Sequence, residues 1–270
     1  QTKKNYYTYN RKFNFVNFID THTHLYIDSF DDDRDEVIQK AINAGIEKFF
    51  LPAIKTSYFD KMNQIKNEYP KNIFLMTGLH PCYVDENYQN ELKIIKDSFS
   101  KEKFCAIGEI GIDLYWEKKF LKQQQNAFEY QIEFALKNDL PIIIHCRNSF
   151  NEVFEVLNNY KSQRLRGIFH CFSGNFSQAQ KVLSLNLKLG IGGIVTFKNG
   201  GLDKFLNMIP IENIVLETDS PYLSPHPFRG KRNESSNLIL VAKKIAEIYS
   251  IDISEVAKRT TKNANEVFDF

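Results

Sequence analysis

Histidines and carboxylates follow short apolar segments at several places along the chain, and these residue types bind divalent metal ions in proteins. The clearest case is Asp20-Thr21-His22-Thr23-His24, in which the two histidines are two residues apart. Side chains at this spacing project to the same side of an extended chain, so both can reach one ion. The same combination recurs at Glu109, His145, His170 and Asp219.

Each of these histidines also has a structural interpretation, because a single histidine beside an apolar segment is more often a hydrogen-bonded core residue than a metal ligand. The joint occurrence of six such residues favours a metal site. A mixed imidazole and carboxylate set suits Zn²⁺, Mn²⁺ or Fe²⁺, and in part Mg²⁺. Six ligands exceed what one tetrahedral ion needs, so two divalent ions that share a bridging carboxylate are the economical arrangement.

Eight short apolar or β-branched segments bounded by turn residues can form the strands that position these side chains. The predicted strands are residues 15–19, 48–51, 73–77, 104–107, 142–144, 167–169, 187–191 and 213–216.

Between these strands lie stretches whose apolar residues recur at spacings of three and four, as in amphipathic helices. Examples are residues 33–44, 58–68, 119–137 and 178–183, and residues 236–270 read as two closing helices.

Strands and helices that alternate about every 30 residues indicate βαβ units with a parallel sheet. Eight units predict an α/β fold of the TIM (β/α)₈ barrel type, in a single domain over residues 13–270. Residues 1–12 are predicted to be a flexible N-terminal extension. The competing open doubly wound sheet often has a glycine-rich turn after its first strand, whereas histidines follow it here. Reactive groups of barrels gather at the carboxyl ends of the strands, where the six candidate ligands occur.

Composition and charge limit the protein class. Hydrophobic residues make up 43% and charged residues 25% of the 270 residues, as in soluble globular proteins. The longest apolar runs are far shorter than the roughly 18 residues of a membrane span. The formal net charge of +2 is small for a protein that coats nucleic acid, so any contact with DNA should be local to a site.

The four cysteines have no CxxC spacing and are expected to be reduced thiols of a cytoplasmic protein. The first dozen residues contain no apolar core of the kind that a signal peptide needs. No membrane association and no obligate protein partner are expected.

Six segments together resemble those of the TatD deoxyribonucleases, a branch of the amidohydrolase superfamily. The resemblance runs in order from about Phe18 to the carboxyl terminus. The segments are Asp20-Thr21-His22-Thr23-His24-Leu25, Gly78-Leu79-His80-Pro81, Gly108-Glu109-Ile110-Gly111-Ile112-Asp113, His170-Cys171-Phe172-Ser173-Gly174, Glu217-Thr218-Asp219-Ser220-Pro221-Tyr222-Leu223 and Arg229-Gly230-Lys231-Arg232-Asn233-Glu234.

The resemblance implies a metal-dependent nuclease on a TIM barrel, with Mg²⁺, Mn²⁺ or Zn²⁺ as the metal. The implied ligands are His22, His24 and Asp219 for one ion, His145 and His170 for the other, and Glu109 as the bridge. Two positions depart from the family pattern: Ile112 replaces the usual Leu, and Ser235 replaces a Pro that often follows Asn-Glu. Both lie outside the ligand set.

The expected reaction is exonucleolytic hydrolysis of phosphodiester bonds in DNA, by attack of a metal-bound water on phosphorus. Glu109 and Asp219 are the catalytic candidates, and Asp219 is expected to orient the water and to accept its proton. An end of a single strand, or a frayed end, should enter a recessed barrel mouth more readily than a continuous duplex.

Basic and aromatic residues near the predicted strand ends could bind the substrate. Arg147 follows His145 by two residues and could clamp a phosphate oxygen. Arg229, Lys231 and Arg232 lie after the eighth strand, where barrels often hold phosphate groups, although such a loop could also be simply solvated. Tyr115-Trp116 could stack against bases or could pack on the barrel rim.

Other chemistry is less well supported. The predicted bridge is a glutamate, which argues against sites built on a carboxylated lysine. The sequence contains no His-Glu-x-x-His and no Gly-x-Ser-x-Gly segment, so a thermolysin-type protease and a serine hydrolase are unsupported. The roles of His80 and His226 stay open, with His80 at the mouth and His226 in a loop.

Two rival functions remain open at this stage. The same site could hydrolyse the ester of aminoacyl-tRNA or of a small phosphorylated or acylated molecule. A non-catalytic barrel is the rival from another class, and the complete ligand set argues against it.

Overall fold

The structure is a computed structural model that describes residues 17–116 and 118–270. Among these residues, eight strands lie in chain order, the first three in one sheet and the last five in another, and every pair within these sheets is parallel. The strands are β1 (Phe18–Asp20), β2 (Ile46–Pro52), β3 (Ile73–Met76), β4 (Ile107–Asp113), β5 (Ile142–Arg147), β6 (Gly167–Phe169), β7 (Leu187–Ile191) and β8 (Ile214–Leu216).

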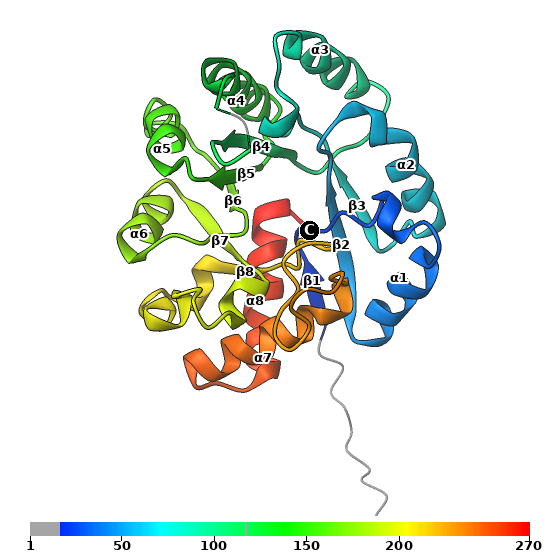
Figure 1. Cartoon of the computed structure of the whole chain (residues 1–270), viewed down its shortest axis with the longest axis vertical. Coiled ribbons are helices and arrows are strands. Elements are labelled where there is room, and N and C mark those ends of the chain that lie inside the picture. The colour runs from blue at the N-terminus through cyan, green and yellow to red at the C-terminus, as the bar shows by residue number, and fades with distance from the viewer. Residues whose placement is uncertain (1–16, 117) are drawn as a thin grey trace, which may run out of the picture.

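Backbone hydrogen bonds close the strands into a ring. Between β3 and β4, the amide of Thr77 donates to the carbonyl of Ala106 at 3.1 Å, and the amide of Gly108 donates to the carbonyl of Thr77 at 2.8 Å. Between β8 and β1, the amide of Thr21 donates to the carbonyl of Leu216 at 3.1 Å. Figure 1 shows the strands around a common centre. The predicted (β/α)₈ barrel is confirmed.

The helices are α1 (Arg34–Asn43), α2 (Phe59–Glu68), α3 (Tyr88–Ser98), α4 (Leu121–Lys137), α5 (Phe150–Asn158), α6 (Phe176–Ser184), α7 (Leu238–Tyr249) and α8 (Ile253–Phe268). All of these except α8 cover the outside of the barrel (Figure 1). The helices predicted at residues 33–44, 58–68 and 119–137 and the closing pair are confirmed, and the stretch 178–183 lies inside α6. Short 3₁₀ turns take the place of an α-helix between β7 and β8.

The helix α8 closes the amino-terminal end of the barrel. Its apolar side chains Ala264, Val267 and Phe268 pack against side chains that the strands direct inward. Phe268 stacks on Phe50 of β2 with ring centroids 3.9 Å apart. The other buried side chains of this cluster are Ile19, Met76, Ala106, Ile143, Ile168 and Val215. Because this end is filled with apolar groups, polar chemistry is left to the carboxyl ends of the strands.

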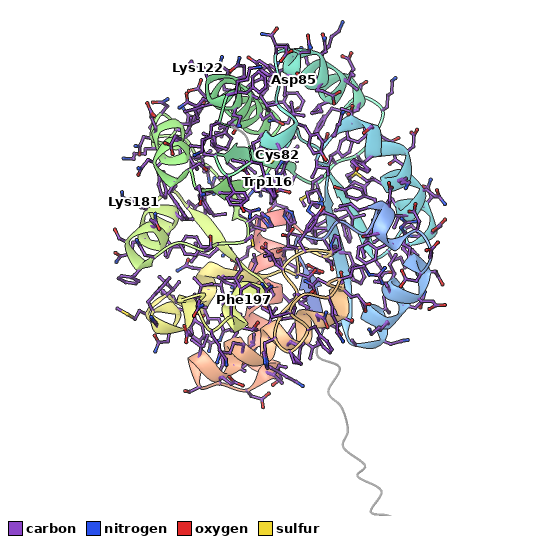
Figure 2. All side chains as sticks on the ribbon, in the orientation of Figure 1. Cys82, Asp85, Trp116, Lys122, Lys181 and Phe197 are labelled. Atoms are coloured by element: carbon purple, nitrogen blue, oxygen red, sulfur yellow. The ribbon has the colours of Figure 1, made fainter. Side chains whose placement is uncertain are left out.

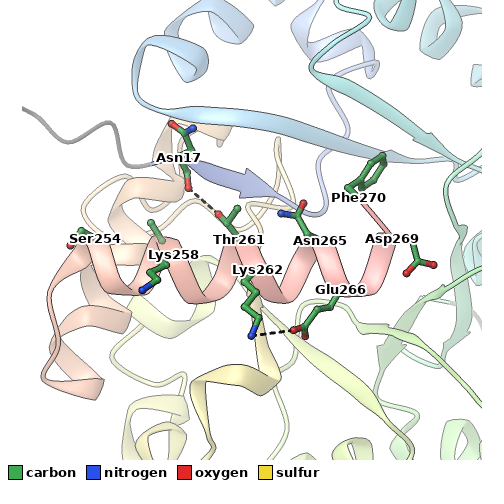
Figure 3. A pocket seen from close by; sticks show the side chains of 10 residues that line it. Asn17, Ser254, Lys258, Thr261, Lys262, Asn265, Glu266, Asp269 and Phe270 are labelled. Atoms are coloured by element: carbon green, nitrogen blue, oxygen red, sulfur yellow. Dashed lines mark hydrogen bonds and ion pairs between the residues drawn. The ribbon is translucent and has the colours of Figure 1, made fainter.

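The outer face of α8 is polar. Together with Asn17 it lines a shallow surface pocket, in which the hydroxyl of Thr261 donates to the carbonyl of Asn17 at 2.9 Å and Lys262 pairs with Glu266 at 3.6 Å (Figure 3). This pocket lies beside the start of β1, at the opposite end of the strands from the candidate ligands. Its ion pair is of the exposed helical kind, which contributes little.

The fourth and fifth strands run further along the chain than predicted. The fourth strand was expected at residues 104–107 and the fifth at 142–144, whereas β4 spans Ile107–Asp113 and β5 spans Ile142–Arg147. Glycine and glutamate interrupt the apolar pattern after Ile107, yet every residue of β4 is buried. Glu109 and His145 therefore lie within strands and not at their ends.

Several other predictions concern the ends of the chain and the membrane. The predicted extension, residues 1–12, and the first two residues of the first predicted strand, 15 and 16, lie outside the described residues. All four cysteines are free thiols. Among the described helices, none is long and apolar enough to cross a membrane.

The contact between β4 and β5 gives a first prediction. Gly111 has a φ of +137°, and a β carbon there would lie 2.0 Å from the carbonyl oxygen of His145. We expect Gly111→Ala to lower the free energy of unfolding by roughly 2–5 kcal/mol, through backbone strain and overpacking. Urea unfolding followed by circular dichroism measures this loss.

Gly230→Ala is the matched control. Gly230 also has a positive φ, of +80°, but a β carbon at this position would have no neighbour within 4 Å. The variant should lose only about 1–2 kcal/mol, from the left-handed conformation alone. Equal losses in the two variants would contradict the importance of the close approach to β5.

Candidate metal centre

The six side chains predicted as metal ligands meet at the carboxyl-terminal end of the barrel. His22 and His24 follow β1, Glu109 belongs to β4 and His145 to β5. His170 and Asp219 follow β6 and β8. All except His145 are buried, with relative exposures of 8% or less. The barrel therefore removes a cluster of ionisable groups from water.

The first group of ligand atoms consists of two imidazole nitrogens and two carboxylate oxygens. His22 Nε2 lies 3.3 Å from His24 Nε2 and 3.2 Å from Glu109 Oε2. Asp219 Oδ1 lies 3.3 Å from His24 Nε2 and 3.8 Å from His22 Nε2. Ligand atoms about 2.0–2.2 Å from one tetrahedral ion lie roughly 3.3 Å apart, so this group has the spacing that a small divalent cation needs.

The second group shares Glu109 with the first. Its other oxygen, Oε1, lies 2.8 Å from His145 Nδ1 and 3.6 Å from His170 Nε2. His80 also reaches this oxygen, with Nε2 at 3.2 Å. Each oxygen of one carboxylate thus faces a different set of histidines, which is the geometry of a bridging ligand.

The far nitrogens of two histidines contact carboxylates that can only accept a hydrogen bond. His145 Nε2 lies 2.9 Å from Asp113 Oδ2, and His170 Nδ1 forms an ion pair with Glu217 Oε1 at 3.0 Å. The proton therefore belongs on the far nitrogen. In the neutral ring, the nitrogen that faces the cluster then carries the lone pair, as a metal ligand requires.

The hydroxyl of Tyr26 orients His24 so that its Nε2, too, carries the lone pair. Its Nδ1 lies 2.9 Å from the hydroxyl oxygen of Tyr26, and that hydroxyl donates its own hydrogen to the carbonyl of Pro52 at 2.6 Å. The oxygen of Tyr26 must therefore accept from His24 Nδ1, which leaves the lone pair of His24 Nε2 directed at the first group.

The chemistry of the donor set thus fits divalent cations. His22 and His24 lie beside one oxygen of Glu109, and His145 and His170 lie beside the other. His170 also lies close to the first group, since it clusters with His22 and Glu109 and its Nε2 is 3.9 Å from Asp219 Oδ1. The assignment of an individual ion to each group stays a prediction.

The pKa values of the buried side chains keep negative charge in the site, which favours a bound cation. Burial alone would raise the pKa of the Glu109 carboxyl, but the surrounding imidazoles, with the charged His170 among them, outweigh burial and hold that pKa well below its ordinary value. Burial disfavours a charged His170, yet Glu217 and Glu109 raise its pKa to about 10. Burial lowers the pKa of His22 to about 4, so this ring is neutral.

Asp113 and Glu217 were not predicted as site residues, although both belong to segments that carry the family resemblance. Asp113 is four residues after Glu109, and Glu217 is two residues before Asp219, so each shares the phase of a ligand along an extended chain. This even spacing from a predicted ligand could have indicated that both carboxylates face the site. Burial would raise the pKa of Asp113, but its hydrogen bonds to His145 and to the amide of Trp116 lower it to about 2.

Asp20 was also unassigned, and it ties the end of β1 to the end of β8. Its two carboxylate oxygens accept from the amide and the hydroxyl of Thr218, at 2.9 and 2.6 Å. Burial raises the pKa of Asp20 to about 7. This residue holds the His22 and Asp219 segments side by side without itself facing the ligand cluster.

Arg147 and two aromatic side chains lie at the mouth. The Arg147 guanidinium lies 4.1 Å from the ring centre of Tyr115 and 5.5 Å from that of Trp116. Figure 2 shows Trp116 projected near the middle of the barrel. Tyr115 is 52% and Trp116 67% exposed, so both rings are open to solvent, and their role in base stacking stays a prediction.

The basic residues after β8 contact the protein itself. Arg232 pairs with Asp33 at the start of α1 and donates to the carbonyl of Ser29 at 2.6 Å. Arg229 stacks over Phe197 at 3.7 Å and Lys231 lies 5.9 Å from the ring centre of Phe228. A substrate role for all three stays a prediction.

The two histidines whose roles were open differ in position. His80 lies within the ligand cluster, whereas the side chain of His226 lies on an exposed loop.

Comparisons with known proteins agree with this geometry. The family model described as TatD related DNase matches residues 19–269. The uncharacterized metal-dependent hydrolase YabD of Bacillus subtilis is 37% identical over 250 residues, which cover 92% of this chain and 98% of YabD.

Two solved structures are similar throughout. YjjV, a TatD homologue from Escherichia coli K12, superposes with a TM-score of 0.88 at 27% identity and covers 95% of this chain and 99% of its own. A TatD family hydrolase from Entamoeba histolytica has a TM-score of 0.80 at 25% identity, with 93% and 98% covered.

The protonation of His170 gives a second prediction. Because its pKa is about 10, the ring is charged at pH 7 in the metal-free protein, and its Nε2 proton must leave before this nitrogen binds a cation. We expect Zn²⁺ or Mn²⁺ binding at pH 7 to release about one proton from this residue, and the apparent affinity to rise about tenfold per pH unit up to about pH 10.

Isothermal titration calorimetry in buffers of low and high ionisation enthalpy measures the released protons. The His226→Asn variant, which removes an exposed imidazole, should release as many protons as the unmodified chain. A binding heat that is the same in both buffers would contradict the expected protonation of His170.

Proposed function

Because the chain belongs to the TatD family of metal-dependent hydrolases, we propose that it hydrolyses phosphodiester bonds in DNA with two divalent cations. The observation that carries this proposal is the Glu109 carboxylate, whose two oxygens face separate groups of histidines. Mg²⁺, Mn²⁺ and Zn²⁺ are the candidate metals. Bound there, the cations would act as Lewis acids on a phosphoryl oxygen and lower the pKa of an attacking water.

Asp219 is the proposed proton acceptor. Burial would raise the pKa of its carboxyl, but the hydrogen bond with His24 and the charge of His170 lower it, so the side chain is ionised at neutral pH. With 12% of its side chain exposed, against 3% for Glu109, Asp219 is the carboxylate of the cluster that water reaches more easily. It can orient the attacking water and take its proton.

Arg147 and the aromatic pair suit a nucleic-acid substrate. The guanidinium of Arg147 presents several N–H donors, and stacking on Tyr115 fixes the plane of this fork. The Asp113 carboxylate accepts from the amides of Tyr115 and Trp116, each at 2.9 Å, and so ties their loop to His145. We propose that Arg147 binds a phosphate while Trp116 stacks on a neighbouring base.

The burial of the cluster favours exonuclease action. A scissile phosphate must reach side chains that are at most 8% exposed, apart from His145, at the floor of the mouth. A free or frayed single-stranded end can bend into such a recess more readily than a continuous duplex, so strand ends are the proposed substrate.

A metal add-back experiment tests the proposal. We expect the metal-stripped protein to cleave end-labelled single-stranded DNA once Mg²⁺, Mn²⁺ or Zn²⁺ is restored. Glu109→Ala should reduce this rate by at least roughly a hundredfold, because both groups of ligand atoms lose a shared oxygen. Glu102→Ala, at an exposed position, is the control and should retain full activity.

A covalently closed circle of the same sequence tests the need for an end, and cutting of the circle as fast as the linear strand would argue against exonuclease action. If the protein binds metal but cleaves no DNA with any of the three metals, the favoured function would be ester hydrolysis of aminoacyl-tRNA or of a small phosphorylated or acylated molecule.

The role of Trp116 gives a further prediction. Stacking on a base contributes about 1–3 kcal/mol, so Trp116→Ala should raise KM for single-stranded DNA by roughly 5- to 150-fold. Its KM for an abasic single strand of the same length, which has the phosphates but no bases to stack, should stay the same. Steady-state kinetics on both substrates measures this difference, and an equal change in both would contradict base stacking.

A further inference from the structure

His80 is a fifth histidine at the ligand cluster, and it comes from the loop after β3. Its Nε2 lies 3.2 Å from Glu109 Oε1 and 3.3 Å from His145 Nδ1. Its side chain is 12% exposed, so it lies between the buried ligands and the open mouth. By distance alone, His80 could be a further ligand of the group formed by Glu109 and His145.

The hydrogen bond on its far nitrogen argues against a ligand role. His80 Nδ1 lies 3.1 Å from the backbone nitrogen of Cys82 and accepts its N–H. A backbone amide can only donate, so Nδ1 must carry a lone pair. The remaining ring proton is therefore on Nε2, the nitrogen that faces the cluster.

This arrangement is the reverse of that in the neighbouring histidines. For His24 and His145 the group beside the far nitrogen accepts a hydrogen bond, and for His170 it is a carboxylate in an ion pair, so the near nitrogen can offer a lone pair to a cation. For His80 the group beside the far nitrogen donates, so the near nitrogen offers an N–H. The turn that places Cys82 two residues after His80 fixes this tautomer.

An N–H fixed at a metal cluster is a donor for negative charge. We propose that His80 donates a hydrogen bond from Nε2 to the oxygen of the scissile phosphate that gains negative charge during hydrolysis, and that it is not a metal ligand. This inference rests on the proposed phosphodiester chemistry. Because the N–H is oriented before the substrate arrives, no reorganisation accompanies the reaction, and donors of this kind contribute about 10²–10³-fold to kcat.

The test compares three variants of the full chain loaded with Zn²⁺. His80→Phe keeps a flat ring without a donor, His80→Gln places an amide N–H near the position of Nε2, and His226→Phe removes an exposed imidazole as the control. Three quantities are measured: bound zinc per chain, the dissociation constant of inorganic phosphate, and kcat and KM for bis(4-nitrophenyl) phosphate.

We expect all three variants to keep the zinc content of the unmodified chain. His80→Phe should weaken phosphate binding about 10- to 100-fold, as expected for loss of a hydrogen bond to a charged group, and should lower kcat by roughly a hundredfold. His80→Gln should recover a substantial part of both losses, and His226→Phe should change neither.

Two results would overturn the inference. Loss of zinc from His80→Phe would make His80 a ligand. Zinc and phosphate binding that are both unchanged in His80→Phe would limit His80 to a structural contact with Glu109, since such a contact would not alter phosphate affinity.

A spectroscopic measurement separates this inference from the proposed function. The ¹⁵N spectrum of histidine-labelled, zinc-loaded protein should show His80 protonated on Nε2 and not on Nδ1, and the opposite tautomer would overturn the inference. This readout and phosphate affinity need no turnover. If the protein cleaves no phosphodiester at all, the proposed function fails while the donor role of His80 is still decided.

Discussion

The structure must compensate the negative charge of one buried carboxylate. Glu109 is 2% exposed, and removal of an ionised carboxylate from water is costly unless partners compensate for it. Here the partners are imidazoles from four different strands or strand ends, which approach its two oxygens to between 2.8 and 3.6 Å. Closed parallel strands satisfy this demand because they bring segments that are distant in the chain to one end of the barrel.

A second layer of polar contacts sets the direction of each ring. Asp113 and Glu217 hold His145 and His170 from behind, and the hydroxyl of Tyr26 holds His24. Asp20 joins the first and last strands through Thr218, so the two chain segments that carry the first group of ligands meet at one seam. The barrel places the ligand atoms close together, but these contacts decide which nitrogen of each ring can bind a cation.

The barrel and the ligand positions could be predicted because both are local patterns. His22 and His24 follow an apolar strand directly, and the strand rhythm alone indicates a common end. The length of β4 could not be predicted, since Glu109 and Gly111 look like a turn until the buried neighbours of the strand are known. Nor could the partner of Arg232, since Asp33 lies 199 residues earlier in the chain. The tautomer of His80 could not be predicted either, because it depends on the direction of the backbone N–H of Cys82, which the residue types do not determine.

Because α8 lies at the end of the described chain, its position affects the order in which the barrel can be assembled during synthesis. This helix supplies Val267 and Phe268 to the floor of the barrel, where they pack on residues from the first strands. A growing chain therefore holds every candidate ligand before it holds the helix that seals the interior. During synthesis the ligand segments leave the ribosome first, and the barrel acquires its apolar floor only after all of them.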